Sequence, residues 1–206
     1  ALTLAQRIVD QELTVLSPVD RQLARSRLLG SAAGTGLVER FIRIETARPG
    51  EVIESLVERP FNGEFELLDR AGAKRRVSIR GVADRVDLLS DGSLRIIDYK
   101  LGRPPRSGRA IQLPVYMTCV SQELARSRNQ SCRPGEAAYV AFGASEPRVP
   151  IFSPGDSAES VLDEGQARFL EAVDDIESGN FPPRPAEDRL CSSCGFVAVC
   201  RKGKRV

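Results

Sequence analysis

Histidine and tryptophan are absent from the 206-residue sequence, and methionine occurs once, as Met117. The lack of histidine excludes hydrolases that depend on an imidazole base and zinc hydrolases with histidine ligands. No apolar run approaches the ~18 residues of a membrane-spanning helix, and the charged N-terminal segment is unlike a signal peptide. We therefore expect a cytoplasmic protein with no membrane contact, whose chemistry uses carboxylate, lysine, cysteine or tyrosine side chains.

Excess charge of one sign is also lacking, because 30 basic and 28 acidic side chains leave a net charge of +2. The local distribution is uneven. Residues 100–109 hold four cations and no acid, whereas residues 156–177 hold eight acids and one arginine, Arg168. This segregation fits a groove with one basic rim, but charge alone favours ordinary solvated surface.

The sequence pattern divides the chain into a helical lead-in (residues 1–36), a core (37–180) and a cysteine-rich C-terminal segment (181–206). Because the chain starts at alanine and its one methionine is internal, we expect it to be a piece of a longer or processed protein. Alternating apolar residues from Val52 to Leu101 predict an antiparallel meander. Its predicted turns are Asn62-Gly63, Ala71-Gly72 and Asp91-Gly92, and the last of these is a typical hairpin dipeptide.

Helical periodicity predicts further helices over 2–29, with a break at Ser17-Pro18, and over 37–46, 110–125 and 157–178, and a strand is expected at 137–142. This order of elements predicts a sheet flanked by helices, in an α/β or α+β fold.

Acidic side chains are concentrated on the predicted hairpin. Asp98 and Lys100 are two apart on a strand and so share a face, and Asp84 on the neighbouring strand can reach the same place. Two carboxylates beside an ammonium are costly to bury, and a divalent cation is the usual compensation. Such a site suits phosphodiester hydrolysis, with Lys100 orienting water or neutralising developing charge. A salt-bridged sheet edge is the alternative.

The use of lysine supports the catalytic interpretation. The chain has 26 arginines and 4 lysines, and Lys100 is the only lysine between positions 75 and 201. This position therefore favours a compact ammonium over a guanidinium. Gln112 and Tyr116 lie four residues apart on the following helix and share a face, from which they could hold DNA or water. A simple polar stripe is the alternative for this pair.

Taken together, three motifs resemble a known family: Gly81-x-x-Asp84-Arg85-x-Asp87, then Ile97-Asp98-Tyr99-Lys100, then Gln112-x-x-x-Tyr116. Their order and spacing are similar to those of the RecB-type nuclease domain of the PD-(D/E)xK superfamily. The closest likeness is to the C-terminal nuclease domain of AddB-like helicase–nuclease subunits. The resemblance implies a restriction-endonuclease-like core with a central mixed sheet of about five strands.

The resemblance also implies residue roles. Asp84, Asp98 and the Tyr99 carbonyl would bind Mg²⁺ or Mn²⁺, Lys100 would be the catalytic lysine, and Gln112 and Tyr116 would support it. Asp87 would lie behind the ligands or pair with an arginine. Many relatives carry a further histidine ligand on the first core helix. Because this chain has none, Glu39 and Glu58 are the candidates to replace it.

Five cysteines, in a sequence with no secretory signal, argue against a disulfide framework. Cys191, Cys194 and Cys200 are similar to the C-terminal cysteine triplet of AddB-like nucleases, where an upstream cysteine completes a [4Fe–4S] cluster. We expect this cluster in the full-length protein and not in the fragment. Zinc or uncoordinated thiols are the alternatives.

The resemblance implies a metal-dependent deoxyribonuclease, an exonuclease on single strands supplied by a helicase partner during double-strand-break repair and recombination. Arg103, Arg106 and Arg109 would contact DNA phosphates. A non-catalytic DNA-binding or scaffold domain with the same fold is one alternative. An iron–sulfur or zinc interaction module is the other.

Overall fold

The computed structural model describes residues 1–32, 34–48, 50–102, 104, 109–129, 131–144, 146–153, 157–180, 183, 185, 188–197 and 199–200. Its helices are α1 (Leu2–Glu12), η1 (Leu13–Val15), α2 (Pro18–Leu29), α3 (Leu37–Thr46), α4 (Gln112–Arg128), α5 (Ala158–Glu177) and η3 (Asp188–Ser193). Its strands are β1 (Gly30–Ser31), β2 (Gly34–Thr35), β3 (Val52–Leu68), β4 (Lys74–Leu89), β5 (Ser93–Lys100), β6 (Arg133–Ala141) and β7 (Arg148–Phe152). No helix in this described part is both long and apolar enough to cross a membrane.

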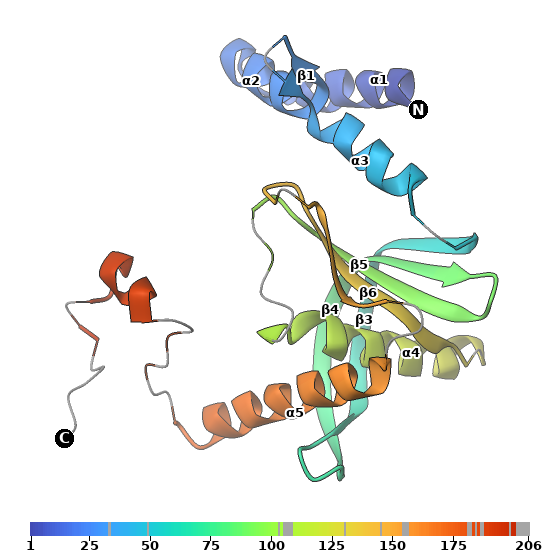
Figure 1. Ribbon diagram of the computed structural model, residues 1–206, viewed down its shortest axis with the longest axis vertical. Helices are drawn as coiled ribbons and strands as arrows, with labels where there is room; N and C mark the ends of the chain where they lie inside the picture. The colour runs from blue at the N-terminus through green and yellow to red at the C-terminus, as the bar shows by residue number, and fades with distance from the viewer. Residues whose placement is uncertain are drawn as a thin grey trace.

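The central sheet has the strand order β3-β4-β5-β6-β7 (Figure 1). Only β5 and β6 run parallel, and the other neighbours are antiparallel. Helix α4 makes the crossover that a parallel pair requires. The expected mixed five-stranded sheet with flanking helices is thus confirmed, and the fold is of the α+β class.

Several predicted boundaries hold, and one predicted turn is wrong. Ser17 caps α2 by accepting the Asp20 N–H at 3.2 Å. Asn62-Gly63 forms no turn, because β3 runs straight through it and pairs these residues with Arg80 and Ile79 of the long strand β4. At φ 152°, Gly63 has a backbone conformation that residues with a side chain rarely adopt, and glycine allows the strand to continue through it.

Strand β7 was not predicted, because Pro150 removes a backbone donor and usually argues against a strand. The structure accommodates it at the edge of the sheet, where one side of the strand has no partner strand. Its other side pairs with β6, from Ala137 opposite Phe152 to Val140 opposite Arg148.

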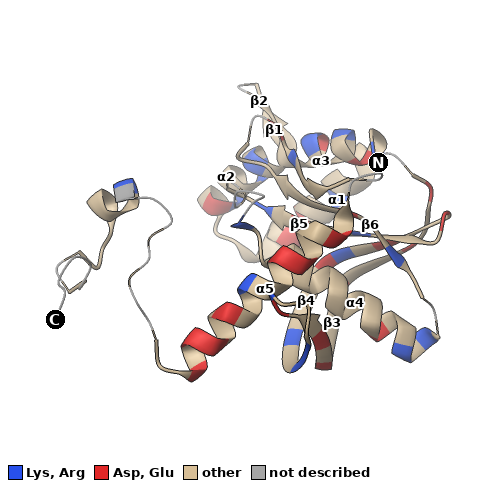
Figure 2. Ribbon diagram, turned by 60° about the horizontal axis from the view of Figure 1, so that its bottom comes forward, with Lys and Arg blue, Asp and Glu red and all other residues tan. Residues whose placement is uncertain are grey.

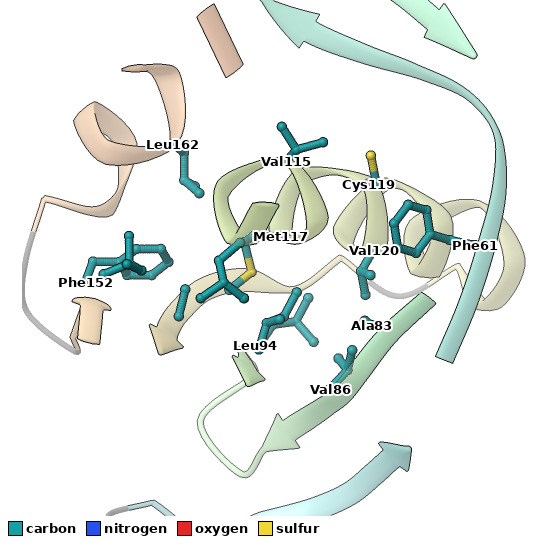
Figure 3. Packing of buried hydrophobic residues seen from close by; sticks show 14 of the residues in the cluster. Phe61, Ala83, Val86, Leu94, Val115, Met117, Cys119, Val120, Phe152 and Leu162 are labelled. Atoms are coloured by element: carbon teal, nitrogen blue, oxygen red, sulfur yellow. The ribbon is translucent and has the colours of Figure 1, made fainter. Parts of the chain in front are cut away.

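The hydrophobic core lies between the sheet and α4. Met117 and Val120 point from α4 toward the strands that carry Leu94 and Ala83 (Figure 3). Helix α5 packs on α4 and closes the core with Leu162. These contacts hold α4 in place, and its first residue is Gln112.

The contact between α5 and α4 is close because α5 has a glycine at the crossing. A Cβ atom at Gly165 would lie 2.3 Å from Cβ of Pro114, so a larger residue there would push the helices apart. Most of the charges on α5 are acidic, and Figure 2 shows red bands along it. They face Arg70 and Arg75 of the β3–β4 end, which pair with Glu171 and Asp174.

Charged side chains fill the opposite face of the sheet. Asp87 is fully buried and accepts hydrogen bonds from Ser55 and Arg85, each at 2.7 Å, and from Arg95 at 3.4 Å. Arg95, 1% exposed, also donates to the buried Glu136 at 3.1 Å. We call these residues, together with Glu45, Arg48 and Arg148, the buried ion network. Of the two roles expected for Asp87, a position behind the metal ligands or a pair with an arginine, the structure shows the pair with arginine.

Replacing Asp87 with alanine should destabilise the fold strongly, because Arg85 and Arg95 would lose their shared carboxylate while staying buried. Loss of one partner from a buried ion pair costs about 3–5 kcal/mol. The free energy of unfolding, measured by urea denaturation followed by circular dichroism, should fall by that amount.

The matched control is Glu171→Ala, because Glu171 pairs with Arg70 on the exposed surface. This change should cost no more than about 1 kcal/mol. Equal losses in the two variants would contradict the prediction.

Candidate active site

Strands β4 and β5 separate at the carboxyl end of β5. Their pairing ends at Arg85 opposite Ile97, although both strands continue. One residue further on, the Oδ2 atom of Asp84 accepts the Tyr99 N–H at 2.8 Å. A carboxylate thus replaces the missing main-chain partner and is fixed at the gap between the strands.

Asp98 lies beside this gap on the α4 side of β5. It is only 3% exposed, and Nζ of Lys100 lies 2.7 Å from its Oδ2 atom. At this distance the ammonium and the carboxylate form a close ion pair, and Lys100 and Gln112 both lower the pKa of Asp98 as hydrogen-bond donors. A carboxylate has about four lone-pair positions, so Asp98 keeps capacity to bind a ligand.

Burial raises the pKa of Asp98 above its ordinary value. Lys100 opposes this shift, and the nearby Asp84 carboxylate adds to it. The net upward direction means that one ammonium does not compensate for burying the charge next to a second carboxylate.

Three groups surround the Lys100 ammonium. Besides Asp98, the Gln112 Oε1 atom at the start of α4 accepts from Nζ at 3.3 Å. The ring of Tyr139 lies beneath it, 5.7 Å from Nζ to the ring centre. Lys100 is therefore held in one place although a third of its side chain is exposed.

Tyr139 is a site residue that the sequence did not reveal. Strand β6 pairs it directly with Asp98, and burial raises the pKa of its hydroxyl to about 12. The ring therefore stays neutral beside the lysine. An aromatic residue in the predicted strand 137–142 was the available signal, but no sequence pattern indicates the parallel pairing of this strand with the strand of Asp98.

Tyr116 packs into the apolar wall next to the site. Its ring meets the Phe61 ring edge-on at a centroid distance of 5.0 Å. Tyr116 also contributes to the raised pKa of Tyr139, so it lies near the cluster formed by Asp98, Lys100 and Tyr139. The Tyr99 side chain points to the other face of the sheet, as predicted. Its ring packs against the ring of Phe41 on α3, with 5.8 Å between the ring centres.

The two candidates for a third acidic ligand occupy different positions. Glu39 on α3 pairs with Arg43 at 3.0 Å. Glu58 lies in register with Asp84, because Val57 and Arg59 pair with the residues on either side of Asp84. Its φ of 48° is rare for a residue other than glycine, and such strain is common near functional sites. Within the described residues, neither completes a group of three metal-binding side chains.

The remaining predicted residues lie outside this group. Arg109 is exposed just before α4, and Arg103 and Arg106 lie outside the described residues. Cys191, Cys194 and Cys200 are half-buried, but the described cysteines and acids form no metal-binding group of three or more. Cys119 lies fully buried in the core, and burial raises its thiol pKa to about 12, so it is a poor thiolate ligand.

The donor set fits a hard divalent cation. Asp84 and Asp98 supply carboxylate oxygens from neighbouring strands, and the buried Asp98 carries a charge that Lys100 does not fully compensate. Oxygen ligands are those that Mg²⁺ and Mn²⁺ prefer. A bound cation would also offset the charge that burial makes costly.

Comparison with known proteins adds independent information. Residues 2–201 match the family described as the PD-(D/E)XK nuclease superfamily. No curated protein matches the sequence significantly. Among solved structures, the crystal structure of SSO0001 is similar, with 18% sequence identity and a TM-score of 0.39, covering 96% of this chain and 82% of that one.

Replacing Asp98 with asparagine should stabilise the metal-free protein at pH 7. Because the folded-state pKa is raised, ionisation of Asp98 lowers stability as the pH rises from 3.8 through the raised value. Asparagine avoids this penalty, so the melting temperature in EDTA should rise by about 2 °C or more.

Added Mg²⁺ should then raise the melting temperature of the wild type and leave that of Asp98→Asn unchanged. Asp163→Asn, an exposed change on α5, is the control and should behave like the wild type. A less stable Asp98→Asn protein in EDTA would contradict the prediction.

Proposed function

The chain belongs to the PD-(D/E)XK nuclease superfamily, and we propose that it is a metal-dependent deoxyribonuclease that hydrolyses phosphodiester bonds. The observation that carries the proposal is the buried Asp98 carboxylate, whose pKa is raised by burial and by the nearby Asp84 although Lys100 lies 2.7 Å away. Asp84, Asp98 and the Tyr99 carbonyl would hold Mg²⁺ or Mn²⁺. When bound, the cation supplies Lewis-acid stabilisation of the charge that develops on the phosphate.

Lys100 acts from a fixed position in this proposal. Gln112 and the Tyr139 ring hold its ammonium next to Asp98, so it can orient an attacking water or neutralise the departing oxygen. A compact ammonium fits this task better than a broad guanidinium would. Tyr116 supports the group by packing beside it.

The resemblance of the motifs supports a more specific role. We propose that the chain is the nuclease part of an AddB-like helicase–nuclease subunit that digests single strands as an exonuclease in double-strand-break repair. Its partners would be DNA and a helicase subunit. Arg109, which is exposed just ahead of α4, would contact a phosphate of the incoming strand.

We further propose a [4Fe–4S] cluster on Cys191, Cys194 and Cys200 in a longer form of the protein. Burial raises the pKa of the thiols of both Cys119 and Cys132, which disfavours the thiolate form, so the fourth thiolate would come from a segment outside these 206 residues. Iron and acid-labile sulfide analysis of that longer protein, purified without oxygen, tests this. About four of each per chain is expected, and Cys194→Ser should lose both.

The direct test of the proposed function is cleavage of end-labelled single-stranded DNA with Mg²⁺ or Mn²⁺. Asp98→Ala and Lys100→Ala should each lower the rate by at least about 100-fold, because each removes a group that stabilises charge in the transition state. Lys100→Ala should keep its affinity for DNA, measured by fluorescence anisotropy.

Asp163→Ala on α5 is the matched control and should cleave at the wild-type rate. Cleavage that persists in Asp98→Ala would refute the proposed site. Failure of every form to cleave, including the longer protein, together with tight DNA binding, would favour the non-catalytic DNA-binding alternative.

A further inference from the structure

A basic pocket of about 400 Å³ lies between α3 and the β6–β7 turn. Its lining residues are Arg40, Arg43, Ile44, Ala47 and Arg48 on one side, and Glu146, Pro147 and Arg148 on the other. Four of these eight residues are arginines and one is a carboxylate. None of the four was identified as a binding residue from the sequence.

The four arginines differ in how they are compensated. Arg48 and Arg148 belong to the buried ion network and form ion pairs with Glu45 and Glu136. These ion pairs fix the positions of the two guanidinium groups. They form a rigid wall for the pocket.

Arg40 and Arg43 are the two arginines with charge left for a ligand. Arg40 donates to the main-chain oxygens of Phe142, at 2.8 Å, and Ala144, at 3.4 Å. Carbonyl partners orient its guanidinium without neutralising it. Within the part of the chain that the structure describes, Arg43 pairs with Glu39, an exposed i,i+4 partner, and 70% of its own side chain is exposed. An exposed pair of this kind is weak, so Arg43 can exchange its partner for another anion.

The pocket and the candidate active site both lie near the carboxyl ends of strands β5 and β6. Phe142 links the two, because its N–H donates to the Lys100 carbonyl at 2.9 Å and its own carbonyl accepts from Arg40. Neighbouring strands are about 4.8 Å apart, so Arg40 is held one strand beyond the strand of Lys100. The two sites face opposite sides of the sheet and come together where the strands end.

We propose that the pocket binds a backbone phosphate of the same nucleic-acid strand that is cleaved at Asp84 and Asp98. The inference rests on the proposed function, because it assigns that substrate a second contact point. Guanidinium groups suit phosphate oxygens, which they bind through paired hydrogen bonds. A polyanion that follows the sheet edge presents repeated phosphates, and so it can occupy the active site and this pocket together.

The test measures binding of a fluorescein-labelled oligothymidylate by anisotropy in EDTA, over a range of salt concentrations. Arg43→Gln should weaken binding about fivefold to tenfold near 0.1 M salt. It should also reduce the slope of log affinity against log salt by about one, the value for one lost phosphate contact. Arg43 is the suitable position because its ion pair with Glu39 is exposed, so the fold should tolerate the change.

Arg168→Gln is the charge control, because Arg168 also forms an i,i+4 pair, with Glu164 on α5, although its side chain is less exposed than that of Arg43. It removes the same charge and should leave the affinity and the salt slope close to wild type. Equal weakening by the two variants would show a general charge effect and would overturn the proposal.

Removal of the competing carboxylate gives the opposite result. Glu39→Gln should tighten oligonucleotide binding, because Arg43 no longer has to leave an intramolecular partner. Glu164→Gln adds the same net charge on α5 and should have a smaller effect. If Glu39→Gln binds no more tightly than Glu164→Gln, the proposal is wrong.

A free anion is the other source of the same chemistry, and calorimetry with inorganic phosphate distinguishes it. If Arg43→Gln loses phosphate binding but keeps its oligonucleotide affinity, the pocket serves a small anion and the proposal is overturned. The binding assays contain no divalent metal, so they are independent of cleavage. Cleavage that depends on Asp98, with no effect of Arg43→Gln on binding, would refute the pocket and leave the proposed function intact.

Discussion

Strands β4, β5 and β6 are covered on both faces where they pass through the centre of the protein, so a charge placed there must be compensated within the protein. On the α3 face this is achieved by the buried ion network, in which Asp87 and Glu136 each bind more than one arginine. On the α4 face the compensation is incomplete. Asp98 has one ammonium and a second carboxylate nearby, and its pKa is raised despite the ammonium. One sheet thus carries a balanced structural cluster on one face and an unbalanced cluster, suited to a cation, on the other.

Helix α4 contributes residues both to the hydrophobic core and to the candidate active site. Met117 and Val120 bury its middle against the sheet, and Pro114 receives the close approach of Gly165 from α5. Its first residue, Gln112, therefore reaches Lys100 from a rigid base. Precise placement of a group that stabilises charge is what catalysis requires. The apolar packing of the helix is in this sense part of the candidate active site.

What could be predicted from the sequence follows the distance along the chain between interacting residues. Asp84, Asp98 and Lys100 lie on one hairpin, so strand alternation and the Asp91-Gly92 turn were enough to bring them together. Tyr139, the Arg95–Glu136 pair and the link from Arg40 to Phe142 depend on parallel pairing and on contacts between distant segments, which periodicity does not encode. Asn62-Gly63 was misread for a related reason. The long partner strand β4 overrides the local turn preference.

The placement of both aspartates and the lysine on the β4–β5 hairpin also affects the order of folding. A short hairpin closes within about 1–10 μs and at a small entropic cost, whereas parallel pairing of β5 with β6 must wait for the α4 crossover. We therefore expect the carboxylates to come together while they are still hydrated, with the desolvation of Asp98 following only when α4 docks. Assembly of the two carboxylates and burial of their charge would then be separate events in time, and a cation present during folding would bind before the energetic penalty of burial arises.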